Sequence, residues 1–170
     1  MSETLEPALP DHLDEQAERL MHAICDRELK IATAESCTGG MLAALLTDIE
    51  GCGHGFDRGF VTYSKDAKRE LLGIKSEVLD RNDAVSEAVA RAMAEGALKR
   101  STADVAIGVT GFAGPAGAGC EEGLVHFALA RRGRPTLHNV EHFGALGRGA
   151  IRVKSLKVML NMLEESIAEE

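Results

Sequence analysis

The chain has little of what binding to nucleic acid, insertion into a membrane or a disulfide scaffold would require. It carries 19 lysines and arginines against 27 acidic residues, which gives a net charge of −8. Neutralising many phosphates needs a basic surface, so this charge disfavours a general binder of nucleic acid or anionic membranes. No apolar run reaches the roughly 20 residues of a transmembrane helix. We therefore expect neither partner, although a local basic pocket for one phosphate is compatible with the composition.

Cysteine is also scarce, and its spacing is not typical of a zinc or disulfide framework. No Cys-x-x-Cys pair occurs among the four cysteines: Cys25, Cys37, Cys52 and Cys120. The "CGH" segment at 52–54 offers two side chains of metal-binding type, which is too few for a site. We expect free thiols in a reducing compartment. Because the N-terminal residues also lack the basic and apolar regions of a signal peptide, the expected location is the cytoplasm.

What the sequence does have is an alternation of helix-like and strand-like segments along its 170 residues. Two of the four prolines fall in residues 1–10, which we interpret as a flexible lead-in to a single domain at 11–170. Apolar spacing predicts helices from residue 11 to about 24, over 41–47, over 66–72, after Ser86 and over 147–166. Strands are expected at 30–34, 59–63, 104–111, 123–133 and 136–143, the last two as an antiparallel hairpin. This order predicts a three-layer α/β/α sandwich around a mixed, mostly parallel sheet.

Three expected strand ends carry residues of the types used in catalysis and ligand binding. They are "TAESCTGG" at 33–40, "TYSKDAK" at 62–68 and "TGFAGPAG" at 110–117. In doubly wound sheets, ligands bind beyond the carboxyl ends of the strands. If the three strands are neighbours, the three segments form one site.

The first segment combines a serine with a pair of glycines. Gly39 and Gly40 allow the backbone to approach a ligand closely, and N–H groups at a helix start attract an anion. Ser36 would lie at the mouth of such a pocket, where backbone amides can also stabilise an oxyanion, and Thr38 adds a hydroxyl. Capping of the following helix by Ser36 or Thr38 explains the same residues. Both interpretations stay open on this segment alone.

The second segment offers a base. Lys68 lies one helical turn beyond the expected strand, and a lysine that is partly desolvated in a cleft has a lowered pKa and can accept a proton from a serine. Tyr63 can hydrogen-bond to either partner and hold or relay a proton. A solvated surface charge is the alternative for Lys68, as for most lysines. Lys65 and Arg69 are close by, and periodicity does not choose among the three.

The third segment is rich in glycine but matches neither the P-loop nor the dinucleotide-binding pattern. Thr110, Gly111, Ala113 and Gly114 can offer backbone contacts to a nucleotide. A loop of this composition is also a common connection between strands. The segment alone does not separate these two interpretations.

Four motifs occur together and in order: "TAESCTGG", "FDRGFVTYSKDAKRELLGI", "AVSEAVARAMAEGAL" and "GVTGFAGPAG". In sequence and spacing they resemble the CinA C-terminal domain family, over roughly residues 12–165. Members of that family are nicotinamide-nucleotide amidohydrolases. The resemblance implies deamidation of nicotinamide mononucleotide to nicotinate mononucleotide and ammonia, in salvage of pyridine nucleotides, by a protein without the domain that precedes this one in longer members.

The resemblance also implies roles for individual residues. Ser36 matches the nucleophile, Lys68 its base and Tyr63 a helper, while Cys37 is expected to point into the core. The expected substrate contacts come from the glycine-containing loops and the last helix: Glu35, Thr38, Gly39, Gly40, Thr110, Gly111, Ala113, Gly114, Arg148 and Arg152. The start of the helix after Gly40 is expected to hold the substrate's phosphate. The resemblance implies no metal and no cofactor, a small nucleotide as substrate, and a homo-oligomer.

Two departures from the family pattern leave alternatives open. The loop at 117–123 is short and carries Glu121 and Glu122, and Gly147 stands where the family has an aspartate. Carboxylates repel a phosphate, so this loop favours a nucleotide-binding or regulatory module with weak turnover as one alternative. Another is an amidohydrolase of the same Ser–Lys chemistry that acts on a different amide.

Overall fold

The computed structural model describes residues 9–81 and 83–168. Most of the expected lead-in, residues 1–8, lies outside these ranges. Within them, Leu9 packs against the main core, and Pro10 occupies the N-cap position of the first helix, α1 (Asp11–Asp26). The five apolar residues that predicted this helix are all buried: Leu13, Ala17, Leu20, Met21 and Ile24.

A five-stranded sheet with the order β2-β1-β3-β4-β5 forms the centre of the molecule. Its strands are β1 (Ile31–Glu35), β2 (Phe56–Val61), β3 (Val105–Gly111), β4 (Leu124–Arg131) and β5 (Leu137–His142). β1 pairs in parallel with both β2 and β3, whereas β4 pairs antiparallel with β3 and β5. Since only β4 runs against the other strands, the sheet is mixed and mostly parallel, and the late hairpin is confirmed.

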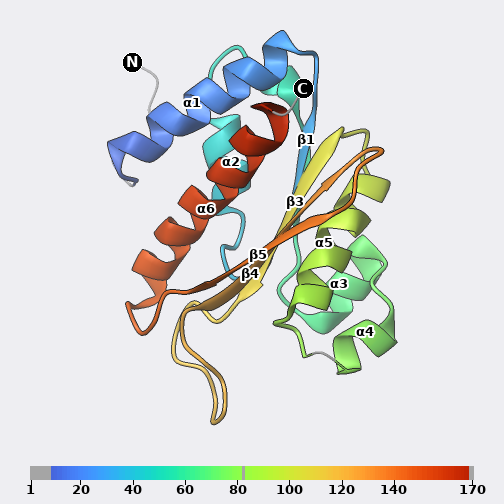
Figure 1. The fold of residues 1–170 in the computed structure, drawn as a ribbon, viewed down its shortest axis with the longest axis vertical. Coiled ribbons are helices and arrows are strands. Elements are labelled where there is room, and N and C mark those ends of the chain that lie inside the picture. Colours follow the sequence, from blue (N-terminus) through green and yellow to red (C-terminus); the bar gives the residue numbers. More distant parts are fainter. Residues whose placement is uncertain (1–8, 82, 169–170) are drawn as a thin grey trace.

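Helices cover both faces of this sheet (Figure 1). On one face lie α1, α2 (Met41–Thr47) and α6 (Arg148–Ala168); on the other lie α3 (Lys65–Leu72), α4 (Ser76–Arg81) and α5 (Glu87–Lys99). The buried side chains divide in the same way, into one core beneath α1, α2 and α6 and a second beneath α3, α4 and α5. The three-layer α/β/α sandwich is therefore confirmed.

The α5 helix packs against the sheet at very short range. A Cβ atom at Gly108 of β3 would lie 2.7 Å from the Ala94 nitrogen of α5, and the surrounding contacts are made by alanines. Ser86 caps the helix as expected, because its hydroxyl accepts a hydrogen bond of 3.2 Å from the Val89 N–H. The end of β3 is thus held firmly against one helical layer.

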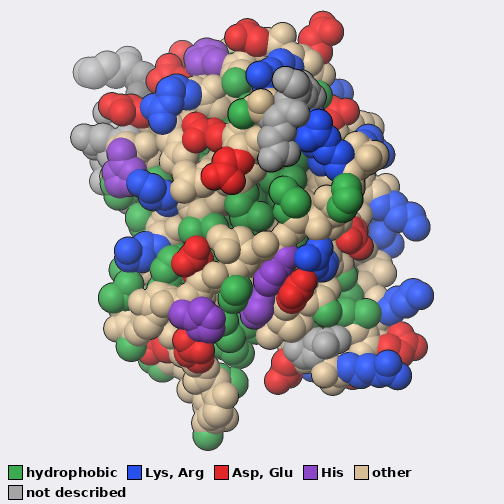
Figure 2. Space-filling model, viewed as in Figure 1, with side chains coloured by type: hydrophobic (Ala, Val, Ile, Leu, Met, Phe, Trp, Pro, Cys, Tyr) green, Lys and Arg blue, Asp and Glu red, His purple; other side chains and the backbone are tan. Residues whose placement is uncertain are grey.

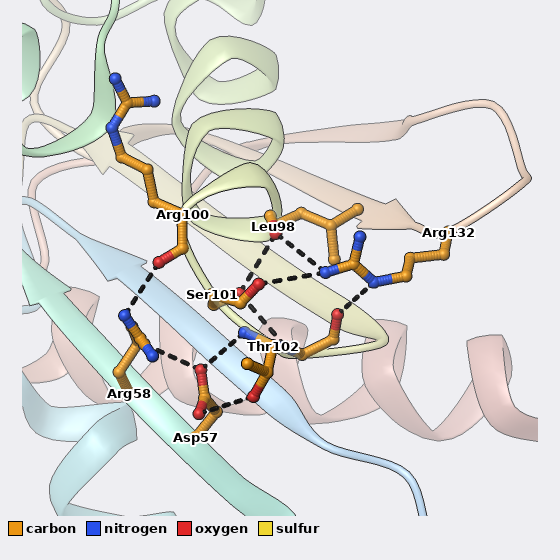
Figure 3. A network of polar contacts seen from close by, with 8 residues as sticks. Asp57, Arg58, Leu98, Arg100, Ser101, Thr102 and Arg132 are labelled. Carbon is orange, nitrogen blue, oxygen red and sulfur yellow. Dashed lines mark hydrogen bonds and ion pairs between the residues drawn. The ribbon is translucent and has the colours of Figure 1, made fainter.

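A polar cluster joins the start of β2 to the loop between α5 and β3 (Figure 3). Asp57 accepts hydrogen bonds from the Thr102 N–H at 3.0 Å, from the Thr102 hydroxyl at 2.9 Å and from the Arg58 guanidinium at 2.8 Å. Arg58 also donates to the Arg100 carbonyl at 3.0 Å, and Arg132 donates to the Ala103 carbonyl at 2.8 Å. We call Asp57, Arg58 and Thr102 the loop clamp.

Charges of both signs are distributed over the surface. On the face shown in Figure 2, Lys and Arg side chains alternate with Asp and Glu, and no continuous basic area is seen among the described residues. None of the helices within residues 9–81 and 83–168 has the length and apolar character needed to span a bilayer.

Candidate active site

The three strand ends that the sequence singled out meet at one edge of the sheet. The pairing places Glu35 of β1 beside both Val61 of β2 and Val109 of β3. Consequently Ser36, Thr62 and Thr110, each one residue further along the chain, lie at neighbouring strand ends. The expectation that these strands are neighbours is confirmed.

Ser36 is held in a tight turn directly after β1. Its N–H donates to the Val109 carbonyl at 3.1 Å, and its carbonyl accepts from the Gly39 N–H at 3.1 Å. Gly39 and Gly40 have φ angles of 62° and 97°, in the left-handed region that glycine adopts without strain. The turn leaves the Ser36 side chain on the rim of the core, with 7% of the residue exposed.

Glu35 caps α2 from within the strand. Its carboxylate accepts hydrogen bonds from the N–H groups of Gly40 (3.2 Å), Leu42 (3.1 Å) and Ala43 (2.9 Å) and from the Thr38 hydroxyl (2.6 Å). This carboxylate, and neither Ser36 nor Thr38, is the helix cap. The amides of this helix start are not free, so the expectation that they hold the substrate's phosphate was wrong.

Lys68 lies on α3 and is fully buried, with 0% of the residue exposed. Its Nζ is 2.9 Å from the Ser36 Oγ, 2.8 Å from the Thr62 carbonyl and 3.3 Å from the Tyr63 carbonyl. No carboxylate forms an ion pair with Lys68 among the residues that the structure describes. Burial therefore lowers the pKa of Lys68 to about 8.

The three oxygen atoms around Nζ suit a neutral amine. A neutral amino group has two N–H donors and one lone pair. If it donates to the carbonyls of Thr62 and Tyr63, its lone pair is directed to the Ser36 hydroxyl, which then donates its proton to Nζ. The geometry is that of a serine hydroxyl beside a general base, and it selects Lys68 over the exposed Lys65 and Arg69.

Tyr63 takes a different position from the expected one. The residue is 68% exposed, and within the described part of the chain its hydroxyl has no hydrogen-bond partner. Only its carbonyl contacts Lys68. The strand ends at Val61, two residues earlier than expected, so the Tyr63 side chain is not fixed by the sheet. The expected hydrogen bond of its hydroxyl to Ser36 or Lys68 is absent.

The residues at the end of β3 and in the loop after it mainly make contacts within the fold. The Thr110 hydroxyl donates to the Ala84 carbonyl at 2.6 Å, and a Cβ atom at Gly111 would lie 2.7 Å from the Leu124 carbonyl oxygen of β4. Ala113 belongs to the main core. Only Gly114 meets another expected site residue, since a Cβ atom there would be 2.9 Å from the Arg148 guanidinium.

The start of α6 brings two arginines to the glycine-containing loops. Arg152 donates from Nε to the Cys37 carbonyl at 2.8 Å, and its NH2 group lies 3.7 Å from the position of a Cβ at Gly39. Arg148 lies over Gly114 in the same way. Neither guanidinium pairs with a carboxylate in residues 9–81 and 83–168. Two cations without counter-ions therefore face loops that have no side chain in the way.

Two further groups near the strand ends are accounted for by local contacts. Glu121 binds His142 of β5 at 2.8 Å, which gives this carboxylate a partner outside the Ser36–Lys68 pair. Cys37 is buried in the core, and burial raises the pKa of its thiol to about 12. Cys37 is thus a poor nucleophile despite its position next to Ser36. Within the described ranges, no three His, Cys, Asp or Glu side chains are grouped to hold a metal ion.

Fold and site together define an α/β/α protein with a buried Ser–Lys pair at the carboxyl ends of parallel strands. The sequence profile of the CinA C-terminal domain matches residues 13–167, so the chain belongs to the CinA C-terminal domain family.

The chain is similar both to known sequences and to solved structures. The chain is 48% identical over 117 residues to the nicotinamide-nucleotide amidohydrolase PncC of Escherichia coli K12, a match that covers 67% of this chain and 70% of that protein. It is 52% identical over 115 residues to a CinA-like protein of Akkermansia muciniphila, across 66% of this chain and 28% of the relative. A crystal structure of the competence/damage inducible protein CihA from Agrobacterium tumefaciens superimposes with a TM-score of 0.91 at 42% identity, over 99% of this chain and 100% of that one. The chain spans between 26% and 36% of the length of several competence-damage inducible relatives.

Proposed function

We propose that the protein hydrolyses the carboxamide of nicotinamide mononucleotide, releasing ammonia and nicotinate mononucleotide. The observation that carries this proposal is the 2.9 Å contact between the Ser36 hydroxyl and the buried Lys68 amine, which has no carboxylate partner in the part of the chain that the structure describes. The activity named for the Escherichia coli relative supplies the substrate. A serine activated by a lysine of lowered pKa is suited to attack on an amide carbon.

In the proposed acylation, Lys68 takes the Ser36 proton as Oγ bonds to the carboxamide carbon. The tetrahedral oxyanion then collapses, the C–N bond breaks, and the protonated Lys68 returns the proton to the departing nitrogen, which leaves as ammonia. A water molecule next gives its proton to Lys68 and attacks the Ser36 ester. Collapse of this second intermediate frees the nicotinate carboxyl group and restores the Ser36 hydroxyl.

The oxyanion has candidate donors in the turn that holds Ser36. The Thr38 N–H donates to no acceptor among residues 9–81 and 83–168, and the acceptor recorded for the Cys37 N–H is its own side-chain sulfur. They lie in the middle of the turn closed by the Gly39–Ser36 hydrogen bond. Two fixed backbone donors beside the nucleophile can stabilise the developing negative charge without reorganisation. In this proposal Glu35 positions the turn and does not touch substrate.

The phosphate is assigned to Arg148 and Arg152. Their guanidinium groups lack carboxylate partners in the described chain and lie over Gly114 and Gly39, where an ester phosphate could approach the backbone. Arginine binds phosphate through paired N–H donors, which orients the ligand as well as attracting it. This arrangement replaces the start of α2 as the expected phosphate site.

The test is ammonia release from nicotinamide mononucleotide by the purified protein and by the Ser36→Ala and Cys37→Ala variants. Wild type and Cys37→Ala should release ammonia, whereas Ser36→Ala should lose at least about a thousandfold in kcat/KM and stay folded. Binding of the mononucleotide without release by the wild type would instead support a nucleotide-binding module. Loss of activity in Cys37→Ala together with an active Ser36→Ala would refute the choice of nucleophile.

A further inference from the structure

A second group of nucleophilic side chains lies away from the Ser36–Lys68 pair, where α1 meets the loop before β2. Cys25 on α1 donates from Sγ to the Cys52 carbonyl at 3.4 Å. A short helical turn, η2 (Gly53–Gly55), follows Cys52, and a Cβ atom at Gly55 would lie 2.9 Å from the Cys25 Sγ. The missing side chain at Gly55 therefore lets the Cys25 thiol lie directly against the Cys52 loop.

Cys52 has a base within reach. Its Sγ lies 3.4 Å from Nδ1 of His22, and Nε2 of the same imidazole is 3.7 Å from the Glu18 carboxylate. His22 and Glu18 lie one turn apart on α1, so the helix fixes their spacing. Thiol, imidazole and carboxylate thus lie in a row, with the Glu18 carboxylate placed to pair with His22 when the imidazole is protonated.

The two thiols differ in their surroundings. Burial and the neighbouring Cys52 thiol raise the pKa of Cys25 to about 11, so Cys25 stays protonated at neutral pH. Cys52 is the thiol that contacts the imidazole, so His22 is placed to accept its proton as the sulfur reacts. Cys25 is partly exposed and only 4% of Cys52 is exposed, while Gly51 and Gly53 on either side of Cys52 are exposed and have no side chains.

We infer that Cys52 and Cys25 form a peroxide-reactive pair that closes a reversible disulfide. In the first step, the Cys52 sulfur attacks one oxygen of hydrogen peroxide as its proton passes to His22. The O–O bond breaks, the protonated His22 gives the proton to the departing hydroxide, and a Cys52 sulfenic acid and water result. In the second step, the Cys25 sulfur bonds to the Cys52 sulfur while the Cys25 thiol proton passes to the departing hydroxyl, which leaves as a second water. In total, two thiols and one peroxide give one disulfide and two waters.

The disulfide closes a ring over residues 25–52 of the chain. This ring contains β1, the Ser36 turn and α2. Constraining this segment in the unfolded chain raises the melting temperature of the oxidised protein relative to the reduced one. The inference does not depend on the proposed deamidase activity, because none of its residues contacts Ser36 or Lys68.

The test treats the reduced, folded protein with equimolar hydrogen peroxide and maps its peptides without reduction. Tryptic cleavage leaves Cys37 and Cys52 together, so a second protease that cuts after Glu50 is needed to separate them. A Cys25–Cys52 cross-link that dithiothreitol reverses is expected, with Cys37 and Cys120 unmodified. In Cys25→Ser, dimedone should trap a sulfenic acid on Cys52.

A matched pair of histidine variants tests the role of the base. His22→Gln should slow cross-link formation by about tenfold or more, because Cys52 loses its proton acceptor. His12→Gln, an exposed histidine on the same helix, should react at the wild-type rate. The inference is overturned if the folded protein forms no Cys25–Cys52 cross-link, or if Cys37 or Cys120 is oxidised before Cys52. Equal rates in the two histidine variants would remove His22 from the mechanism.

Discussion

The Ser36–Lys68 pair and the loop clamp each combine a basic side chain with a hydroxyl group, but only the loop clamp also contains a carboxylate. In the loop clamp, Arg58 faces Asp57, and every oxygen of that carboxylate has a donor. At the site, the polar partners of the buried Lys68 amine within residues 9–81 and 83–168 are a hydroxyl and two carbonyl groups. A paired surface cluster stabilises a fold modestly, whereas a buried amine without a carboxylate partner lowers stability when it is charged and is typical of a reacting group.

The starts of α2 and α6 show the same contrast. The start of α2 is neutralised by the carboxylate of Glu35, but the arginines at the start of α6 have no carboxylate partner in the described chain. Charges that hold the fold are therefore matched, and charges that face the strand ends are not. Four predictions test this distinction.

Replacing Lys68 should have the largest effect on turnover. Lys68→Met removes the proton acceptor, and kcat should fall by about a thousandfold. In the wild type, kcat/KM should fall about tenfold for each pH unit below 8, because the pKa of Lys68 is about 8 and only the neutral amine accepts the Ser36 proton. Rates of ammonia release from pH 6 to 9 measure both. Lys65→Met, on the same helix, should keep the wild-type profile, and a flat wild-type profile would exclude Lys68 as the base.

The same substitution should also change how stability depends on pH. The folded-state pKa of Lys68, about 8, lies below its ordinary value of 10.5, so between these pH values the unfolded chain binds more protons. Titration of Lys68 should therefore add up to about 3 kcal/mol to the stability of the wild type, relative to Lys68→Met, across that window. Lys68→Met should lack this rise. Urea unfolding of both proteins at pH 7.5 and 10 measures the difference, and parallel changes would show that Lys68 titrates normally.

Much of this architecture is predictable from the sequence, because it depends on periodicity. The helix at 41–47 begins and ends where apolar spacing places it, and the apolar run of 105–111 is a central strand. The short α4 was missed, since six residues from Ser76 to Arg81 with one buried side chain give no periodic signal. Apolar periodicity alone also could not identify Lys68 as the base, because the burial of its side chain depends on how α5 and the sheet pack around α3.

The cap of α2 was also not predictable from the sequence, but the reason differs from that for α4. Helix caps are usually sought at the residue just before the first turn, which is Gly40 here. Glu35 reaches the same N–H groups from five residues upstream, because the Ser36–Gly39 turn folds the chain back on itself. The signal would be an acidic residue at the end of a buried strand, directly before a glycine-containing turn. Such a carboxylate must find donors, since it cannot remain buried without them.

The loop clamp should show the opposite behaviour to Lys68. The hydrogen bonds from Thr102 and Arg58 outweigh the burial of Asp57, so the pKa of this carboxyl is lowered. Asp57→Asn should therefore lower the free energy of unfolding by about 1 kcal/mol at pH 7 and leave kcat/KM unchanged. Asp66→Asn, which breaks only the exposed pair with Arg69, is the control and should change neither quantity. Loss of turnover in Asp57→Asn would show that the clamp and the site are coupled.

Tyr63 should give the smallest effect, and its outcome decides how far the site extends beyond the buried pair. Because the hydroxyl has no partner in the described chain and the residue is 68% exposed, Tyr63→Phe should change kcat/KM by less than about threefold. Tyr63→Ala keeps the carbonyl that accepts from Lys68 but removes the ring, so it separates the backbone contact from the side chain. If Tyr63→Phe instead lowers kcat as strongly as Lys68→Met does, the ring must close over Ser36 when substrate binds. The hydroxyl would then join the proton transfer, and the unmatched buried pair would be only part of the catalytic group.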